Sequence, residues 1–141
     1  MKTWFRTGGE RYGRDGCRVP LPWTAAGAAY GFSPTGAAWL PQPIEWATLA
    51  RDVQTTDASS TLSLYRALLG LRRKHALGAG TLTWLDGLGK DAVAFRNGNV
   101  TVIANIGSRP IRLPGGIVIA ASGPLTGDLL PGDTTAWVVG G

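Results

Sequence analysis

The chain has 141 residues, the size of one ordinary domain, and its 44% hydrophobic content is typical of a globular protein. The formal net charge of +5 would suit an anionic partner. However, the cations are dispersed and no recognised nucleic-acid-binding module accompanies them, so the sequence predicts no nucleic-acid partner.

Cysteine and histidine occur once each, as Cys17 and His75. A single cysteine excludes an internal disulfide, and one residue of each type makes a zinc site implausible. We therefore expect no cofactor and no metal. No apolar run reaches the length of a signal peptide or of a membrane span, which predicts a cytoplasmic protein with no membrane partner.

Residues 1–57 show no convincing periodicity, although they are rich in glycine, proline and tryptophan. A structureless run of this length is uncommon inside a compact domain. A linker, in turn, is poor in large aromatics, because tryptophan needs burial or a ligand. The segment is therefore interpreted as a long excursion that belongs to a larger scaffold.

Residues 60–76 are predicted to form a helix. Asp57, Ser59 and Ser60 are all competent N-caps, and Gly78 follows as a C-terminal stop. The apolar residues cover about half of the helical wheel, and a basic run complements the dipole of the last turn. Arg72 falls inside the apolar arc, which indicates either a structural ion pair or a stem that carries its charge out to water.

The pattern changes to short β-branched segments after residue 80. The predicted strands are 81–85, 91–96, 99–106, 109–113, 117–121 and 134–139. Between the second and third of them, Asn97-Gly98 predicts a hairpin with a type I′ turn, which needs positive φ at both positions. Strands at this spacing favour a small antiparallel sandwich or barrel.

One loop carries candidate binding chemistry, the segment GRDGCRVPLPW at residues 13–23. Its glycines and prolines fix an irregular backbone. Arg14, Asp15 and Arg18 can hydrogen-bond to hydroxyl groups, and the face of Trp23 can stack on a sugar ring. The alternative interpretation is a rigid loop tied by an internal Arg–Asp pair.

This string resembles the segment GRDGCRxPxPW of bacterial α-glucosidases in glycoside hydrolase family 13, the group that includes oligo-1,6-glucosidase. The resemblance continues in order through GFS at 31–33, WLP at 39–41, VQ at 53–54 and the helical segment 62–72. It covers residues 4–105 well and the remaining strands loosely.

The resemblance implies an α+β fragment. Residues 1–78 would be the end of a (β/α)8 barrel, comprising an active-site loop and the last helix. Residues 79–141 would be the antiparallel β-sandwich that follows the barrel. Arg14 would help to bind the terminal glucose together with an aspartate that the chain does not contain. Asp15 and Arg18 would mainly shape the loop.

Retaining glycoside hydrolysis requires a nucleophilic carboxylate and an acid/base carboxyl group about 5–5.5 Å apart. The resemblance places the family's catalytic carboxylates upstream of the matched region, so we expect no catalytic residue here. No pair among the chain's own carboxylates has the sequence setting of a tuned dyad. A truncated reading frame would produce such a chain, and alone it is predicted to be inactive.

Three functions remain open from the sequence. The first is a fragment of a retaining α-glucosidase that acts on α-glucoside oligosaccharides when the missing barrel is supplied. The second is a non-catalytic carbohydrate-binding or interaction module. The third is one half of a split enzyme with a separately encoded N-terminal half. Within the family, a glucosyltransferase is also compatible, because water and sugar acceptors compete for the same intermediate.

Overall fold

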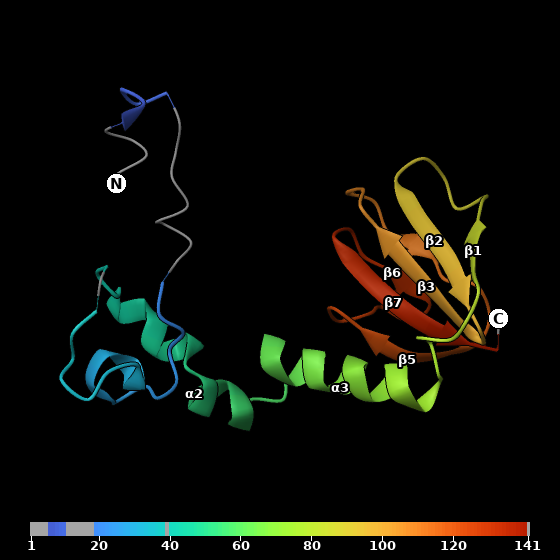
Figure 1. Cartoon of the computed structure of the whole chain (residues 1–141). Helices are drawn as coiled ribbons and strands as arrows, with labels where there is room; N and C mark the ends of the chain where they lie inside the picture. The colour runs from blue at the N-terminus through green and yellow to red at the C-terminus, as the bar shows by residue number, and fades with distance from the viewer. Residues whose placement is uncertain (1–5, 11–18, 39, 141) are drawn as a thin grey trace. The chain divides into compact units, whose positions relative to one another are not determined.

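The computed structural model describes residues 6–10, 19–38 and 40–140, and its chain divides into two compact units (Figure 1). Unit 1 spans Met1–Ser63 and unit 2 spans Leu64–Gly141. The division falls inside helix α3 (Thr61–Lys74), so each unit is considered by itself.

Unit 1 contains short helical segments joined by loops. Two 3-10 helices, η2 (Ala28–Gly31) and η3 (Ile44–Leu49), precede helix α2 (Arg51–Thr56). No sequence pattern predicted these elements, because each spans six residues or fewer and so cannot display a helical repeat.

Helix α3 confirms the helix predicted over 60–76, and Ser60 is its N-cap. The Ser60 hydroxyl oxygen accepts a hydrogen bond from the backbone amide of Ser63 at 3.1 Å. Asp57 does not cap this helix. Its carboxylate instead accepts hydrogen bonds from the backbone amide and the hydroxyl of Ser59, at 2.8 and 2.7 Å. Arg72 is exposed, in line with a stem that carries its charge to water.

Unit 2 is built on a five-stranded antiparallel sheet with the order β1-β2-β3-β7-β5. The strands are β1 (Leu82–Leu85), β2 (Ala92–Asn97), β3 (Val100–Asn105), β5 (Ile117–Ala121) and β7 (Thr134–Val139). Strands β4 (Ile111–Arg112) and β6 (Leu129–Leu130) form a separate antiparallel pair. The predicted antiparallel β domain is thereby confirmed, and β6 is a strand that the pattern did not predict.

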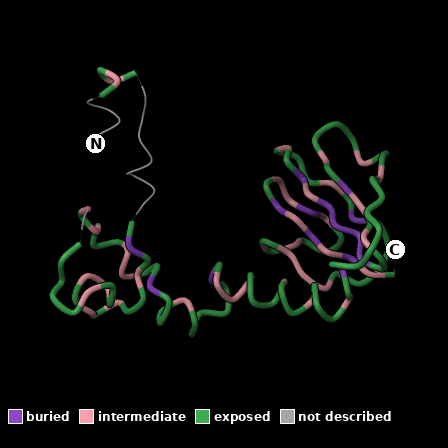
Figure 2. The backbone as a smooth tube through the Cα atoms, viewed as in Figure 1, coloured by how far each residue is buried: buried purple, intermediate pink, exposed green. Residues whose placement is uncertain are grey.

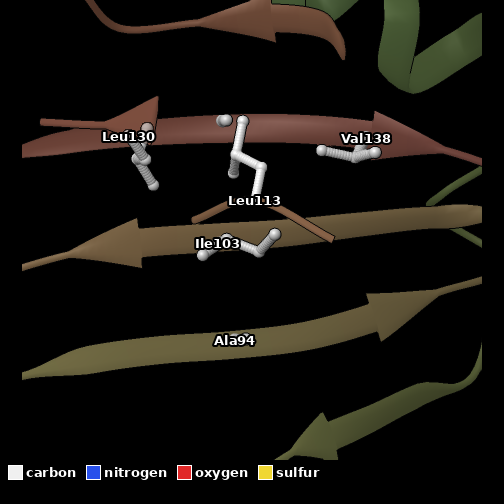
Figure 3. Packing of buried hydrophobic residues seen from close by; sticks show 6 residues of the cluster. Ala94, Ile103, Leu113, Leu130 and Val138 are labelled. Carbon is white, nitrogen blue, oxygen red and sulfur yellow. The ribbon is translucent and has the colours of Figure 1, made fainter. Parts of the chain in front are cut away.

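The core of unit 2 lies between the large sheet and the β4–β6 layer. Ile103 and Val138, from the central strands β3 and β7, pack with Leu113 and Leu130 in one cluster (Figure 3). Strand β7 alternates as a half-buried strand does, because every second residue, beginning with Thr134, is buried. A second cluster on the opposite face of the sheet contains Val100, Val102 and Leu77.

The hairpin predicted at Asn97-Gly98 is confirmed, but its turn differs from the prediction. Asn97 pairs with Val100 and is the last residue of β2, so the two turn residues are Gly98 and Asn99. Of these, only Gly98 has positive φ, at +59°. A single positive φ at the first central position, filled by glycine, is the requirement of a type II′ turn rather than a type I′ turn.

Candidate functional site

Of the candidate loop at residues 13–23, the structure describes only the C-terminal end, residues 19–23. Arg14, Asp15 and Arg18 lie outside the described residues, whereas Trp23 lies within them and is 46% exposed. Trp23 therefore presents its indole to solvent, as a stacking surface for a sugar ring must.

The backbone on both sides of Trp23 is held by the start of α2. The amide of Arg51 donates to the carbonyl of Pro22 at 3.0 Å, and the amide of Asp52 donates to that of Trp23 at 3.2 Å. The Asp52 carboxylate in turn accepts the amide of Ala25 through both oxygens, at 3.2 and 3.1 Å. These contacts fix residues 22–25 although the segment belongs to no helix or strand.

A left-handed turn at residues 29–31 supports Trp23 from the other side. Ala29, Tyr30 and Gly31 have φ values of 45°, 51° and 76°, a conformation that is costly for residues with a side chain. The carbonyl of Tyr30 accepts the amides of Trp23 and Thr24, at 2.8 and 3.1 Å. The strained turn is therefore part of the structure that positions Trp23.

Tyr30 also ties this turn to the start of η3. Its hydroxyl donates to the carbonyls of Pro43 and Ile44, at 3.1 and 3.3 Å. Glycine is required nearby, because a Cβ on Gly27 would lie 2.2 Å from the hydroxyl oxygen of Thr24. Tyr30 and Asp52 thus hold the loop, and the sequence pattern singled out neither of them.

Apolar residues elsewhere in the described part of unit 1 are also open to solvent. The exposed fraction is 60% for Leu21, 53% for Phe32 and 80% for Ile44. The Asp52 carboxylate, by contrast, is already engaged by backbone amides.

Several described carboxylates have structural partners. Asp52 and Asp57 accept backbone amides, and Asp128 forms an ion pair with Arg112 in unit 2. The hydrogen bonds from the Ser59 hydroxyl and amide lower the pKa of Asp57 below its ordinary value of 3.8. A lowered pKa keeps this carboxyl group ionised, which does not suit a general acid.

Comparison with known proteins identifies relatives of the chain, although no family model matches it. Salivary alpha-glucosidase from Aedes aegypti is 28% identical over 107 residues, which cover 72% of this chain and 18% of that protein. The solved structure of the alpha-glucosyl transfer enzyme XgtA matches with a TM-score of 0.69 and 31% identity. That match covers 91% of this chain and 26% of that one.

The chain thus spans about a fifth to a quarter of the length of these relatives. The matches support the resemblance to α-glucosidase-like proteins that the sequence predicted. Among the described residues, every helix is too short or too polar to span a lipid bilayer.

Proposed function

We propose that the chain is part of a retaining α-glucosidase that removes terminal α-linked glucose from oligosaccharides. The observation that carries this proposal is the similarity to a glucosyl transfer enzyme over 91% of the chain at 31% identity. The second relative is an α-glucosidase by name, so both matches point to chemistry at an α-glucosidic bond.

In this proposal unit 1 supplies substrate contacts. The indole of Trp23 stacks on a glucose ring, and the hydrogen bonds of the Trp23 backbone to Tyr30 and Asp52 hold that backbone in place. Arg14 binds sugar hydroxyls, with Asp15 and Arg18 shaping the loop. Residues 1–78 would then complete a (β/α)8 barrel, and residues 79–141 would follow it as the β domain.

The catalytic carboxylates come from outside this chain. A retaining mechanism needs a matched nucleophile and acid/base, and the described carboxylates with known partners serve backbone and ion-pair contacts instead. The missing groups would belong to a barrel that is joined to this segment or encoded separately. Hydrolysis or glucosyl transfer would follow, depending on whether water or a sugar attacks the glycosyl-enzyme intermediate.

We place the protein in the cytoplasm. The single cysteine supports this, because stabilising disulfides are characteristic of oxidising compartments.

The proposal is tested with the purified chain, free of host glucosidase. We expect no turnover of an aryl α-glucoside, together with weak binding of maltose that quenches tryptophan fluorescence. Trp23→Ala should weaken maltose binding about threefold to tenfold, the loss expected for one stacking contact. The matched control is Trp84→Ala, at a tryptophan of unit 2 that is 65% exposed. Robust turnover by the pure chain would contradict the proposal.

The same experiment separates the two alternatives. Maltose binding that never leads to hydrolysis, whichever barrel segment is added, would favour a carbohydrate-binding module. Activity that appears when a separately encoded N-terminal half is added would favour a split enzyme. If the DNA upstream of Met1 continued in frame and encoded the missing carboxylates, both parts would belong to one longer enzyme.

A further inference from the structure

A hollow in unit 2 lies at one end of the sheet, remote in sequence from the Trp23 loop. Its volume is about 500 Å³, within the range of about 300–1,000 Å³ that small-molecule sites occupy. Two loops line it, one leading into β2 and the other following β3. The residues that matter for its chemistry are Lys90, Asp91, Ser108 and Arg109.

The walls of this hollow are fixed by Asn105, which is 1% exposed. Its side-chain amide donates to the carbonyls of Arg109 and Leu130, at 2.8 and 3.0 Å, and its oxygen accepts the amide of Gly107 at 3.1 Å. The loop that carries Ser108 and Arg109 is therefore anchored to the interior of the sheet. A fixed loop loses little conformational entropy when a ligand binds.

The two loops are also joined to each other. The amide of Ile106 donates to the carbonyl of Asp91 at 2.9 Å. Gly107 permits this close approach, because a Cβ at that position would lie 2.7 Å from the Cβ of Asp91. The base of the hollow is apolar, since Leu88 and Ile111 line it and pack against the core cluster. The hollow is therefore formed before any ligand arrives.

Its charges have no partner within the part of the chain that the structure describes. There Arg112 pairs with Asp128, but neither Lys90 nor Arg109 has a carboxylate within ion-pair distance. The hollow is lined by two cations, Lys90 and Arg109, and by one carboxylate, that of Asp91, so its net charge attracts anions. A guanidinium binds phosphate through two parallel hydrogen bonds, and an ammonium adds a point charge.

The Asp91 carboxylate determines which groups the ligand can carry besides the phosphate. Its carboxylate accepts hydrogen bonds but repels a phosphate placed against it, so it suits hydroxyl groups. The Ser108 hydroxyl can donate to such groups or accept from them, and the apolar base offers contact to a C–H face. We propose that this hollow binds a phosphorylated sugar or polyol, with the phosphate on Arg109 and Lys90 and the hydroxyls on Asp91 and Ser108.

The test is an amide NMR titration of the whole chain with glucose 6-phosphate at low ionic strength. We expect shifts at Gly89, Gly107 and Ser108. Arg109→Gln should weaken binding about tenfold, the loss of one charge-assisted hydrogen bond. The matched control is Lys74→Gln, which removes the same charge at the exposed end of α3 and should change the affinity by less than about twofold. Equal weakening by both variants would overturn the proposal, because it would indicate general charge attraction.

Inorganic phosphate and glucose are the second arm of the test. Glucose 6-phosphate should bind more tightly than either, and Asp91→Ala should reduce its advantage over inorganic phosphate several-fold. The assignment of the hydroxyl contacts would be overturned if glucose 6-phosphate bound no more tightly than inorganic phosphate. It would also be overturned if Asp91→Ala left this difference in affinity unchanged. This result is independent of maltose binding at Trp23, so either proposal can fail alone.

Discussion

The two units of the chain are stabilised by different interactions. In unit 2, Ile103, Leu130 and Val100 are completely buried, and the buried positions follow the central strands (Figure 2). In the described part of unit 1, Ala50 is the one hydrophobic residue of the core, while residues such as Phe32 and Ile44 are more than half exposed. The backbone of unit 1 is held by hydrogen bonds rather than by the burial of apolar side chains.

This difference indicates which of the two units has the larger stabilisation from its own contacts. Full burial of a large apolar side chain contributes about 1.5–3 kcal/mol, whereas a typical hydrogen bond contributes a net 0.5–1.5 kcal/mol, because water competes for the same groups. The hydrogen bonds of Tyr30 and Asp52 are exposed, and they hold a turn that is itself strained. Unit 2 is thus stabilised by a buried core, whereas the described part of unit 1 depends on exposed hydrogen bonds.

The largest expected effect is at the core of unit 2. Ile103→Ala should lower the free energy of unfolding of unit 2 by about 2–5 kcal/mol, because it leaves a cavity beside Leu113 and Leu130. Ile44→Ala is the matched control in unit 1, where the side chain is 80% exposed, and should change stability by less than about 0.5 kcal/mol.

Native-state hydrogen exchange measures both variants residue by residue. In Ile103→Ala the amides of Val102 and Val138 should lose protection, while the amide of Ala25 should exchange as before. The contrast between the two units would be wrong if the two substitutions lowered stability equally. It would also be wrong if Ile103→Ala reduced the protection of the Ala25 amide, because the two units would then unfold as one cooperative core.

A smaller effect is expected at the start of α3. Ser60→Ala removes the cap of the Ser63 amide and should destabilise the helix by about 1 kcal/mol. Ser59→Ala removes a hydroxyl that caps no helix amide, and should cost clearly less. The carbon chemical shifts of residues 61–64 report the helix content. Similar losses in the two variants would mean that the assigned cap is wrong.

The antiparallel strands of unit 2 could be predicted from sequence because they are short β-branched segments separated by turn residues. Strand β6 escaped prediction because two leucines between Asp128 and Pro131 are too short a segment to be recognised. The turn at Asn97-Gly98 was predicted one residue too early. The dipeptide indicates a turn, but the register comes from the pairing of Asn97 with Val100, which depends on the facing strand.

The candidate site was less predictable. The exposed indole of Trp23 follows from its place in a glycine- and proline-rich loop. Its anchors do not, because the hydrogen bonds to Tyr30 and Asp52 join positions that are up to 29 residues apart, as between Trp23 and Asp52. Such contacts leave no local repeat in the sequence. Glycine at position 31 suits the positive φ found there, but no local pattern indicates that Tyr30 shares the left-handed conformation.

The smallest effect concerns the turn between α2 and α3, where Asp57 accepts the hydroxyl and the amide of Ser59. These bonds lower the pKa of Asp57 below 3.8 in the folded chain. The stabilisation they provide is therefore present above pH 3.8 and is lost as the pH falls through the folded pKa.

A carboxyl carbon NMR titration should give a midpoint below 3.8 in the wild type and closer to 3.8 in Ser59→Ala, which lacks the larger of the two contributions. Because Asp57 is fully exposed, unit 2 should remain folded throughout this transition, and its sheet amides should keep their protection. A midpoint at or above 3.8 in the wild type would show that the turn does not form in solution, and that hydrogen bonds alone do not define this part of unit 1.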